Sequence, residues 1–128
     1  MEDTKKKILL IEDDPFLSSL LKNRFSKEGL EVMYAKDGQE AVTILKDASP
    51  DVILLDLILP KKSGFEVMEA IRQDPQLRDA PIIIISNLGQ PEDMQKGQEL
   101  GAVEYFVKAK TSIDDLVKNV LEFLTKRQ

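Results

Sequence analysis

Three carboxylates stand directly after two apolar runs of the chain. Ile8–Ile11 is followed by Glu12 and Asp13, and Val52–Leu55 is followed by Asp56. An unbroken apolar run is typical of a strand that is covered on both faces of a parallel sheet. Open parallel sheets place their chemistry at the carboxyl ends of the strands, so these acids are expected to converge there. Because clustered carboxylates stay ionised together only beside a cation, the pattern predicts a divalent metal site with a carboxylate available for chemistry.

The composition limits which metal ions could bind and which reactions are possible. The 128 residues include no cysteine and no histidine, which excludes thiolate and imidazole ligands and favours oxygen-bound Mg²⁺, Mn²⁺ or Ca²⁺. The missing histidine also excludes a phosphohistidine within this chain. A net charge of −5 argues against nucleic-acid binding, and no apolar run reaches membrane-spanning length. We therefore expect a cytoplasmic protein that contacts neither nucleic acid nor membrane directly.

The elements that must position these acids alternate regularly along the chain. Short apolar runs are each followed by an amphipathic segment, which predicts one α/β domain over residues 1–128 with a doubly wound (βα)5 arrangement. The expected sheet is parallel and five-stranded, with the flavodoxin-like order 2-1-3-4-5. This order brings Ser86 and Lys108, which directly follow the predicted strands four and five, to the same crevice as Asp56. The predicted strands are Lys7–Ile11, Glu31–Ala35, Asp51–Leu55, Pro81–Ile85 and Val103–Val107.

Capping residues explain some of the remaining polar side chains. Asp14, followed by Pro15, is expected to cap the first helix and is left out of the site for that reason. Ser63 and Glu66 have the spacing of a capping box, which is structural rather than chemical. The predicted helix Pro91–Leu100 has a glycine in its interior and few large apolar residues, so it is expected to be the least firmly packed.

Taken in order, these motifs resemble the response-regulator receiver domain, the phospho-accepting module of bacterial two-component signalling, and in particular its chemotaxis-regulator type. The resemblance extends over nearly the whole chain. The matching segments are Ile8–Pro15, Asp56–Gly64, Ile82–Ser86, Gly101–Ala102 and Tyr105–Lys108.

The resemblance implies a phosphorylation site and its metal. Asp56 would be the phosphorylated residue and would also ligate Mg²⁺, with Mn²⁺ as a substitute. Asp13 would ligate the ion directly and Glu12 through water, and the backbone carbonyl of Ile58 would complete the set.

The resemblance also implies groups that contact the phosphoryl oxygens. Ser86 would donate a hydrogen bond to one oxygen, Lys108 would pair with another, and Tyr105 would be the aromatic switch that turns inward. One departure concerns the residue after the lysine, which is Ala109 where the family usually has a cis-proline. A cis bond before a residue other than proline costs about 2.5–4 kcal/mol, so this peptide is expected to be trans.

Three positions beside Asp56 would control how easily the phosphoryl group and water reach it. Asn87 stands where the family usually has a small residue. Ile58 and Leu88 occupy the two positions that adjust the access of water to the acyl phosphate. Both are apolar, and the hypothesis is slow autodephosphorylation.

The implied function is a signalling switch rather than an enzyme with a separate substrate. A sensor histidine kinase or a histidine phosphotransfer protein would donate the phosphoryl group, and a downstream protein or effector domain would receive the signal. A monomer is expected.

The main alternative is a receiver-like domain that acts without phosphorylation, which Asn87 and Ala109 leave open. An aspartyl-phosphate hydrolase of the haloacid dehalogenase type would need an acid at Ile58. A nucleotide- or flavin-binding module would need a phosphate-binding loop after the first strand, where Glu12, Asp13 and Asp14 would repel phosphate.

Overall fold

The structure is a computed structural model that describes residues 5–126. Five strands form one parallel sheet in the order β2-β1-β3-β4-β5, which confirms the predicted fold class and strand order. The elements are β1 (Lys7–Ile11), α1 (Pro15–Lys27), β2 (Glu31–Ala35), α2 (Gly38–Leu45), β3 (Val52–Leu55), α3 (Gly64–Gln73), β4 (Ile82–Ser86), α4 (Pro91–Glu99), β5 (Glu104–Val107), the short 3₁₀ helix η1 (Lys108–Lys110) and α5 (Ile113–Lys126).

The predicted strand bounds differ from the observed ones by one residue at several ends. Asp51 lies outside β3, where its carboxylate accepts a hydrogen bond from the Lys7 amide at 2.7 Å. Pro81 lies outside β4, and a proline has no N–H with which to join the ladder. At the other end, Ser86 belongs to β4 and is paired with Val107. The strand therefore carries Ser86 rigidly to the edge of the sheet.

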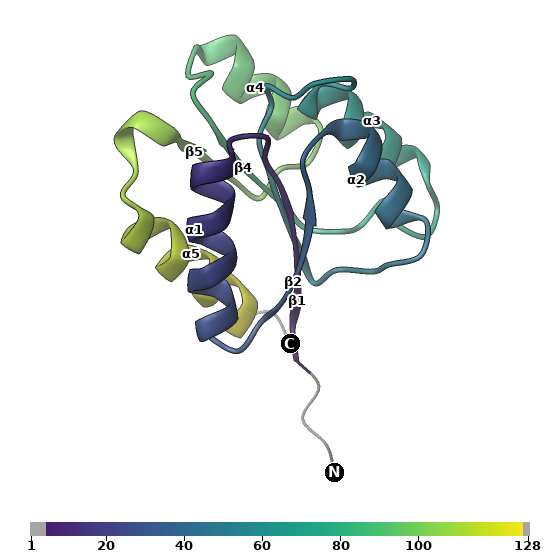
Figure 1. Ribbon diagram of the computed structural model, residues 1–128. Coiled ribbons are helices and arrows are strands. Elements are labelled where there is room, and N and C mark those ends of the chain that lie inside the picture. The colour runs from purple at the N-terminus through teal and green to yellow at the C-terminus, as the bar shows by residue number, and fades with distance from the viewer. Residues whose placement is uncertain (1–4, 127–128) are drawn as a thin grey trace.

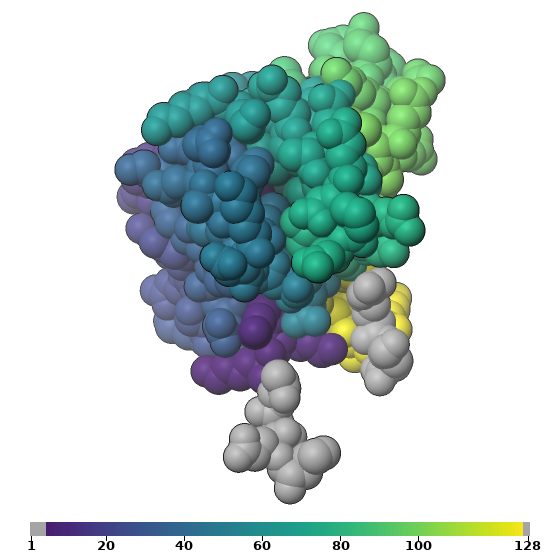
Figure 2. Space-filling model, turned by 90° about the vertical axis from the view of Figure 1, so that its right-hand side faces the viewer, coloured from purple at the N-terminus to yellow at the C-terminus, as the bar shows by residue number. Residues whose placement is uncertain are grey.

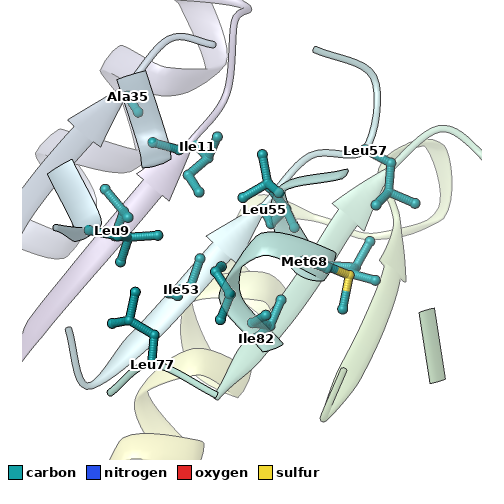
Figure 3. Packing of buried hydrophobic residues seen from close by; sticks show 14 residues of the cluster. Leu9, Ile11, Ala35, Ile53, Leu55, Leu57, Met68, Leu77 and Ile82 are labelled. Atoms are coloured by element: carbon teal, nitrogen blue, oxygen red, sulfur yellow. The ribbon is translucent and has the colours of Figure 1, made fainter. Parts of the chain in front are cut away.

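The helices cover the two faces of the sheet, with α1 and α5 on one side and α2, α3 and α4 on the other (Figure 1). Alternate residues of the central strands face these two layers. Leu9 and Ile11 belong to the core cluster beneath α2 and α3 (Figure 3), whereas Ile8 and Leu10 belong to the cluster beneath α1 and α5. Burial on both faces is the physical reason why these strands are apolar at every position.

The first turns of the helices follow the predicted caps. The Asp14 carboxylate accepts hydrogen bonds from the amides of Phe16 and Leu17, which confirms its role at the start of α1. Ser63 and Glu66 form the reciprocal capping box at the start of α3. These caps are local in sequence, which is why spacing alone could predict them.

Helix α4 is the most weakly anchored by side chains, as expected. Gly97 is its one buried residue, and Met94 keeps 39% of its surface exposed. In the space-filling view, α4 (green) projects at the upper edge of the face that α2 and α3 cover (Figure 2). Among the helices of residues 5–126, none has the length and apolar composition needed to cross a membrane.

Candidate functional site

The three predicted carboxylates meet at the carboxyl edge of the sheet. Ile11 pairs with Leu55, so the residues that follow β1 and β3 leave the sheet side by side. Ligand oxygens of Glu12, Asp13 and Asp56 lie within 4.8 Å of one another. Glu12 and Asp56 are buried and Asp13 is exposed, so the cluster opens to solvent on the side of Asp13.

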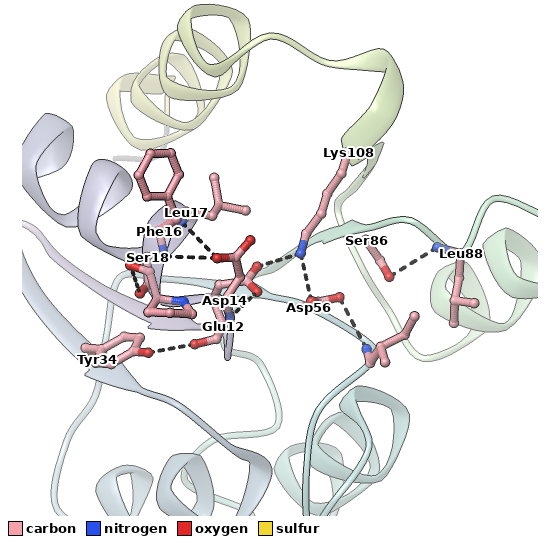
Figure 4. A network of polar contacts seen from close by, with 12 residues as sticks. Glu12, Asp14, Phe16, Leu17, Ser18, Tyr34, Asp56, Ser86, Leu88 and Lys108 are labelled. Atoms are coloured by element: carbon pink, nitrogen blue, oxygen red, sulfur yellow. Dashed lines mark hydrogen bonds and ion pairs between the residues drawn. The ribbon is translucent and has the colours of Figure 1, made fainter.

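Lys108, the first residue of η1 directly after β5, joins this cluster. Its ammonium Nζ lies 2.9 Å from Oε1 of Glu12 and 2.9 Å from Oδ2 of Asp56 (Figure 4). The residues described contain no cis peptide bond, so the peptide between Lys108 and Ala109 is trans, as expected. The chain turns directly into η1 at this point, and Lys108 reaches the acids without the family's usual proline.

Electrostatic effects at the site hold the lysine in its charged form. Burial disfavours the Lys108 ammonium, but its contacts with Glu12 and Asp56 outweigh this effect and raise the pKa of Lys108. Burial also raises the pKa of Glu12, and the neighbouring charge of Asp56 adds to the increase, against the lowering effects of Lys108 and the Asp14 amide. One ammonium therefore faces more negative charge than it can neutralise.

The donor set fits a hard divalent cation. Oε1 of Glu12 is buried and accepts no hydrogen bond of regular geometry from the residues described, although Lys108 lies beside it in an ion pair. The other oxygen of Glu12 accepts a hydrogen bond from the Asp14 amide at 3.0 Å. A buried carboxylate oxygen with a free lone pair, next to the carboxylates of Asp13 and Asp56, is the kind of ligand that Mg²⁺ and Mn²⁺ prefer.

A short chain of hydrogen bonds leads away from the site on its other side. Ser86 is fully buried, and its Oγ accepts a hydrogen bond from the Leu88 amide at 3.3 Å. The carbonyl oxygen of Leu88 accepts a hydrogen bond from the Tyr105 hydroxyl. Burial raises the pKa of Tyr105, and the charges of Asp93 and Asp56 add to the increase. The phenol therefore stays protonated and able to donate.

The three predicted access positions occupy different environments. Ile58 is 54% exposed, and its amide donates a hydrogen bond to Oδ1 of Asp56 at 3.2 Å. Asn87 is exposed, whereas Leu88 is half-buried against the core cluster. The backbone of Ile58 thus contacts Asp56 directly while its side chain faces solvent, and Leu88 contributes to packing.

Two side-chain contacts were not predicted, and only the first of them lies at the site. Tyr34 of β2 donates a hydrogen bond from its hydroxyl to the backbone carbonyl of Glu12 at 2.8 Å. Arg72 of α3 donates to four backbone carbonyls that flank the ends of β4 and α4: those of Leu100, Arg78, Ala80 and Gly101. Neither contact has a local sequence signal: Tyr34 lies 22 residues from Glu12, and Arg72 joins the loop directly after its own helix to one 28 and 29 residues further along the chain.

Comparisons with known proteins agree on one family. The chain matches the response regulator receiver domain family over residues 8–121. The transcriptional regulatory protein CpxR of Escherichia coli K12 is 43% identical over 102 residues, which are 80% of this chain and 42% of CpxR. This chain therefore spans less than half the length of that relative.

Solved structures of response regulators have the same fold as this chain. The phosphorylated cyanobacterial phytochrome response regulator RcpA has a TM-score of 0.88 at 31% identity, and the match covers 98% of this chain and 97% of RcpA. The Mn²⁺-bound response regulator Rcp1 has a TM-score of 0.80 at 31% identity, with 92% and 91% covered. Because the family model matches, the fold is shared and the acidic cluster is present, the chain belongs to the response regulator receiver domains of two-component signalling.

Proposed function

We propose that the protein is a phospho-acceptor switch in which Asp56 receives a phosphoryl group from a histidine of another protein. The observation that carries this proposal is the position of Lys108, whose ammonium lies 2.9 Å from both Glu12 and Asp56 within the carboxylate cluster. The arrangement joins a nucleophilic carboxylate, oxygen ligands for a cation and a fixed positive charge. These are the groups that phosphoryl transfer needs.

The transfer is a displacement at phosphorus. A carboxylate oxygen of Asp56 forms the new O–P bond while the N–P bond of the phosphohistidine breaks. The bonding electron pair stays on the imidazole nitrogen, which takes up a proton from solvent. Because this chain contains no histidine, the donor belongs to a separate protein, either a sensor histidine kinase or a histidine phosphotransfer protein.

Glu12, Asp13, Asp56 and the backbone carbonyl of Ile58 would hold Mg²⁺, or Mn²⁺ in its place. The ion would neutralise charge on the transferring group when bound. Lys108 remains an ammonium and pairs with a second phosphoryl oxygen as the charge on Asp56 increases. A bound metal would also offset the negative charge of the carboxylates around this lysine.

The chain of hydrogen bonds through Leu88 supports a route from the site to the surface. A phosphoryl oxygen can accept a hydrogen bond from the hydroxyl of Ser86, whose Oγ is bonded to the Leu88 amide. Movement of that loop changes the bond between the Leu88 carbonyl and Tyr105, which lies beside α4. Helix α4 is weakly anchored, so the surface formed by α4, β5 and α5 can change conformation. The phosphoryl group shifts the balance between the conformations of this surface.

The proposed target of the signal is a downstream protein or effector domain. CpxR is named a transcriptional regulatory protein, and this chain matches 42% of its length. For this chain we propose output through protein contact at the α4, β5 and α5 surface, with no direct contact between the receiver and nucleic acid.

The test is the incubation of the purified protein with acetyl phosphate and Mg²⁺, followed by intact-mass measurement. We expect the wild type to gain one phosphoryl group and Asp56→Asn to gain none. The matched control is Asp47→Asn, which removes the same charge from an exposed residue and should be modified like the wild type. Modification that persists in Asp56→Asn would place the acceptor elsewhere. If neither acetyl phosphate nor a phosphorylated histidine donor modifies the wild type, the protein acts without phosphorylation.

A further inference from the structure

We infer that Tyr34 is a positioning residue for the metal ligands, an inference that rests on the proposed function. Its hydroxyl donates a hydrogen bond to the backbone carbonyl of Glu12 at 2.8 Å, from the strand next to β1 (Figure 4). Tyr34 does not touch the carboxylate oxygens of the cluster. It acts on the backbone from which the acidic side chains project.

The bonded carbonyl belongs to the peptide that joins Glu12 to Asp13. A peptide group is planar, so a bond that holds its oxygen also holds the direction in which the chain enters Asp13. The amide of Glu12 donates to the carbonyl of Ala35 at 3.1 Å, so both backbone groups of Glu12 are tied to consecutive residues of β2. The turn is thereby fixed on both sides of its first acid.

Asp13 depends on this backbone more than the other two ligands do. Glu12 and Asp56 are buried and paired with Lys108, whereas the Asp13 side chain is exposed and has no recorded hydrogen bond or ion pair with any residue from 5 to 126. The direction of its carboxylate is therefore set mainly by the peptide that precedes it. Loss of the Tyr34 hydroxyl should widen the range of positions that this ligand samples.

Tyr34 is itself held in place. Its half-buried ring packs against the core cluster beneath α1 and α5, and the ammonium of Lys22 lies 4.4 Å from the centre of the ring. A ring held by packing and by a cation loses little further freedom when its hydroxyl bonds to Glu12. The hydroxyl is therefore preorganised to hold the acidic turn in the absence of the ion.

The test is the affinity of the metal-free protein for Mn²⁺ and for Mg²⁺, measured by titration calorimetry without a phosphodonor. Tyr34→Phe keeps the ring and removes the hydroxyl, and we expect it to raise the Kd for both ions about three- to tenfold. Thr43→Val is the matched control, because the Thr43 hydroxyl also donates to a backbone carbonyl, that of Gln39 within α2. It should leave the Kd unchanged, and far-ultraviolet circular dichroism and thermal unfolding should show that both variants are folded.

The outcomes separate this inference from the proposed function. If the wild type binds the ions, Asp13→Asn loses binding and Tyr34→Phe matches the wild type, the inference is overturned and the proposed site stands. If the wild type binds neither ion, the metal site and the inference fail together. If Tyr34→Phe does not fold, Lys22→Met replaces it, because this variant keeps the hydroxyl but removes the cation that holds one face of the ring. A Kd about twofold higher than that of the wild type would then support the inference, and an unchanged Kd would overturn it.

Discussion

Gly97 of α4 lies against Ile84 of β4 so closely that a Cβ atom on residue 97 would stand 2.7 Å from Cδ1 of the isoleucine. The same Cβ would lie 3.3 Å from Cδ2 of Tyr105. Glycine costs a helix interior about 1 kcal/mol relative to alanine. The close approach explains this glycine, which allows the backbone of α4 to lie directly on the sheet next to the tyrosine.

The first prediction concerns Gly97→Ala. The added methyl group must displace Ile84 or lift α4, at a cost of about 1–3 kcal/mol. The gain in helix propensity is about 1 kcal/mol, so the free energy of unfolding should fall by about 1 kcal/mol overall. Urea denaturation measures this change, and Ile84→Val, which removes Cδ1, should recover part of the loss in the double variant. A Gly97→Ala protein more stable than the wild type would show that propensity outweighs the contact.

The second prediction concerns Arg72, which ties the end of α4 to the start of β4. Its guanidinium donates to the carbonyls of Leu100 and Ala80 at 2.7 and 2.9 Å, with further bonds to two neighbouring carbonyls. Arg72→Ala should lower the free energy of unfolding by about 2–3 kcal/mol, since hydrogen bonds from a charged donor are lost.

Urea denaturation and hydrogen exchange measure the effect of the Arg72 substitution. The Val103 amide, which donates to Ile82 at 2.8 Å beside the lost contacts, should exchange faster in Arg72→Ala. Arg78→Ala is the matched control, because Arg78 takes part in this network through its carbonyl and its exposed side chain does not. Equal effects of the two substitutions would refute the role given to the Arg72 guanidinium.

The third prediction follows from Asp37, which caps α2. The Glu40 amide donates to its carboxylate at 2.8 Å, and this bond, assisted by the charge of Lys61, holds the pKa of Asp37 below its ordinary value of 3.8. A carboxyl whose pKa is lower in the folded protein stabilises the fold above its unfolded pKa, and this stabilisation is lost as the pH falls through the folded value.

Asp37→Asn should therefore lose less stability than the wild type when the pH is lowered from 6 through the region below 3.8. Thermal unfolding across this range measures the difference. Asp47→Asn, on an exposed residue, should show the same acid dependence as the wild type. Parallel curves for Asp37→Asn and the wild type would contradict the prediction.

The fourth prediction concerns the lifetime of phosphorylated Asp56. Ile58 is exposed and its amide is bonded to Asp56, so its apolar side chain offers no group that would orient an attacking water. Ile58→Asn should shorten the lifetime after removal of acetyl phosphate, as followed by intact mass. Leu88→Glu should act in the same direction, but it also disturbs a half-buried side chain. An unchanged lifetime in Ile58→Asn would refute slow autodephosphorylation through this position.

The layered architecture and the location of the acids could be predicted from residue types and their spacing. Uninterrupted apolar runs such as Ile8–Ile11 require cover on both faces, and parallel crossovers then allow few strand orders. The strand order alone places Glu12, Asp13 and Asp56 at one edge of the sheet. Helix caps such as Asp14 were equally accessible, because their partners lie within three residues.

The contacts that hold these groups in place depend on the folded arrangement of the chain. The pairing of Lys108 with two acids depends on the direction of a long side chain, and the bond from Tyr34 to the Glu12 carbonyl depends on the register of β1 and β2. The four carbonyls bound by Arg72 come from loops that meet only when the sheet is complete. The bonds from Tyr34 and Arg72 end on backbone carbonyls, which every residue carries, so residue types do not predict these acceptors. Their partners are selected by distance and direction in the folded chain.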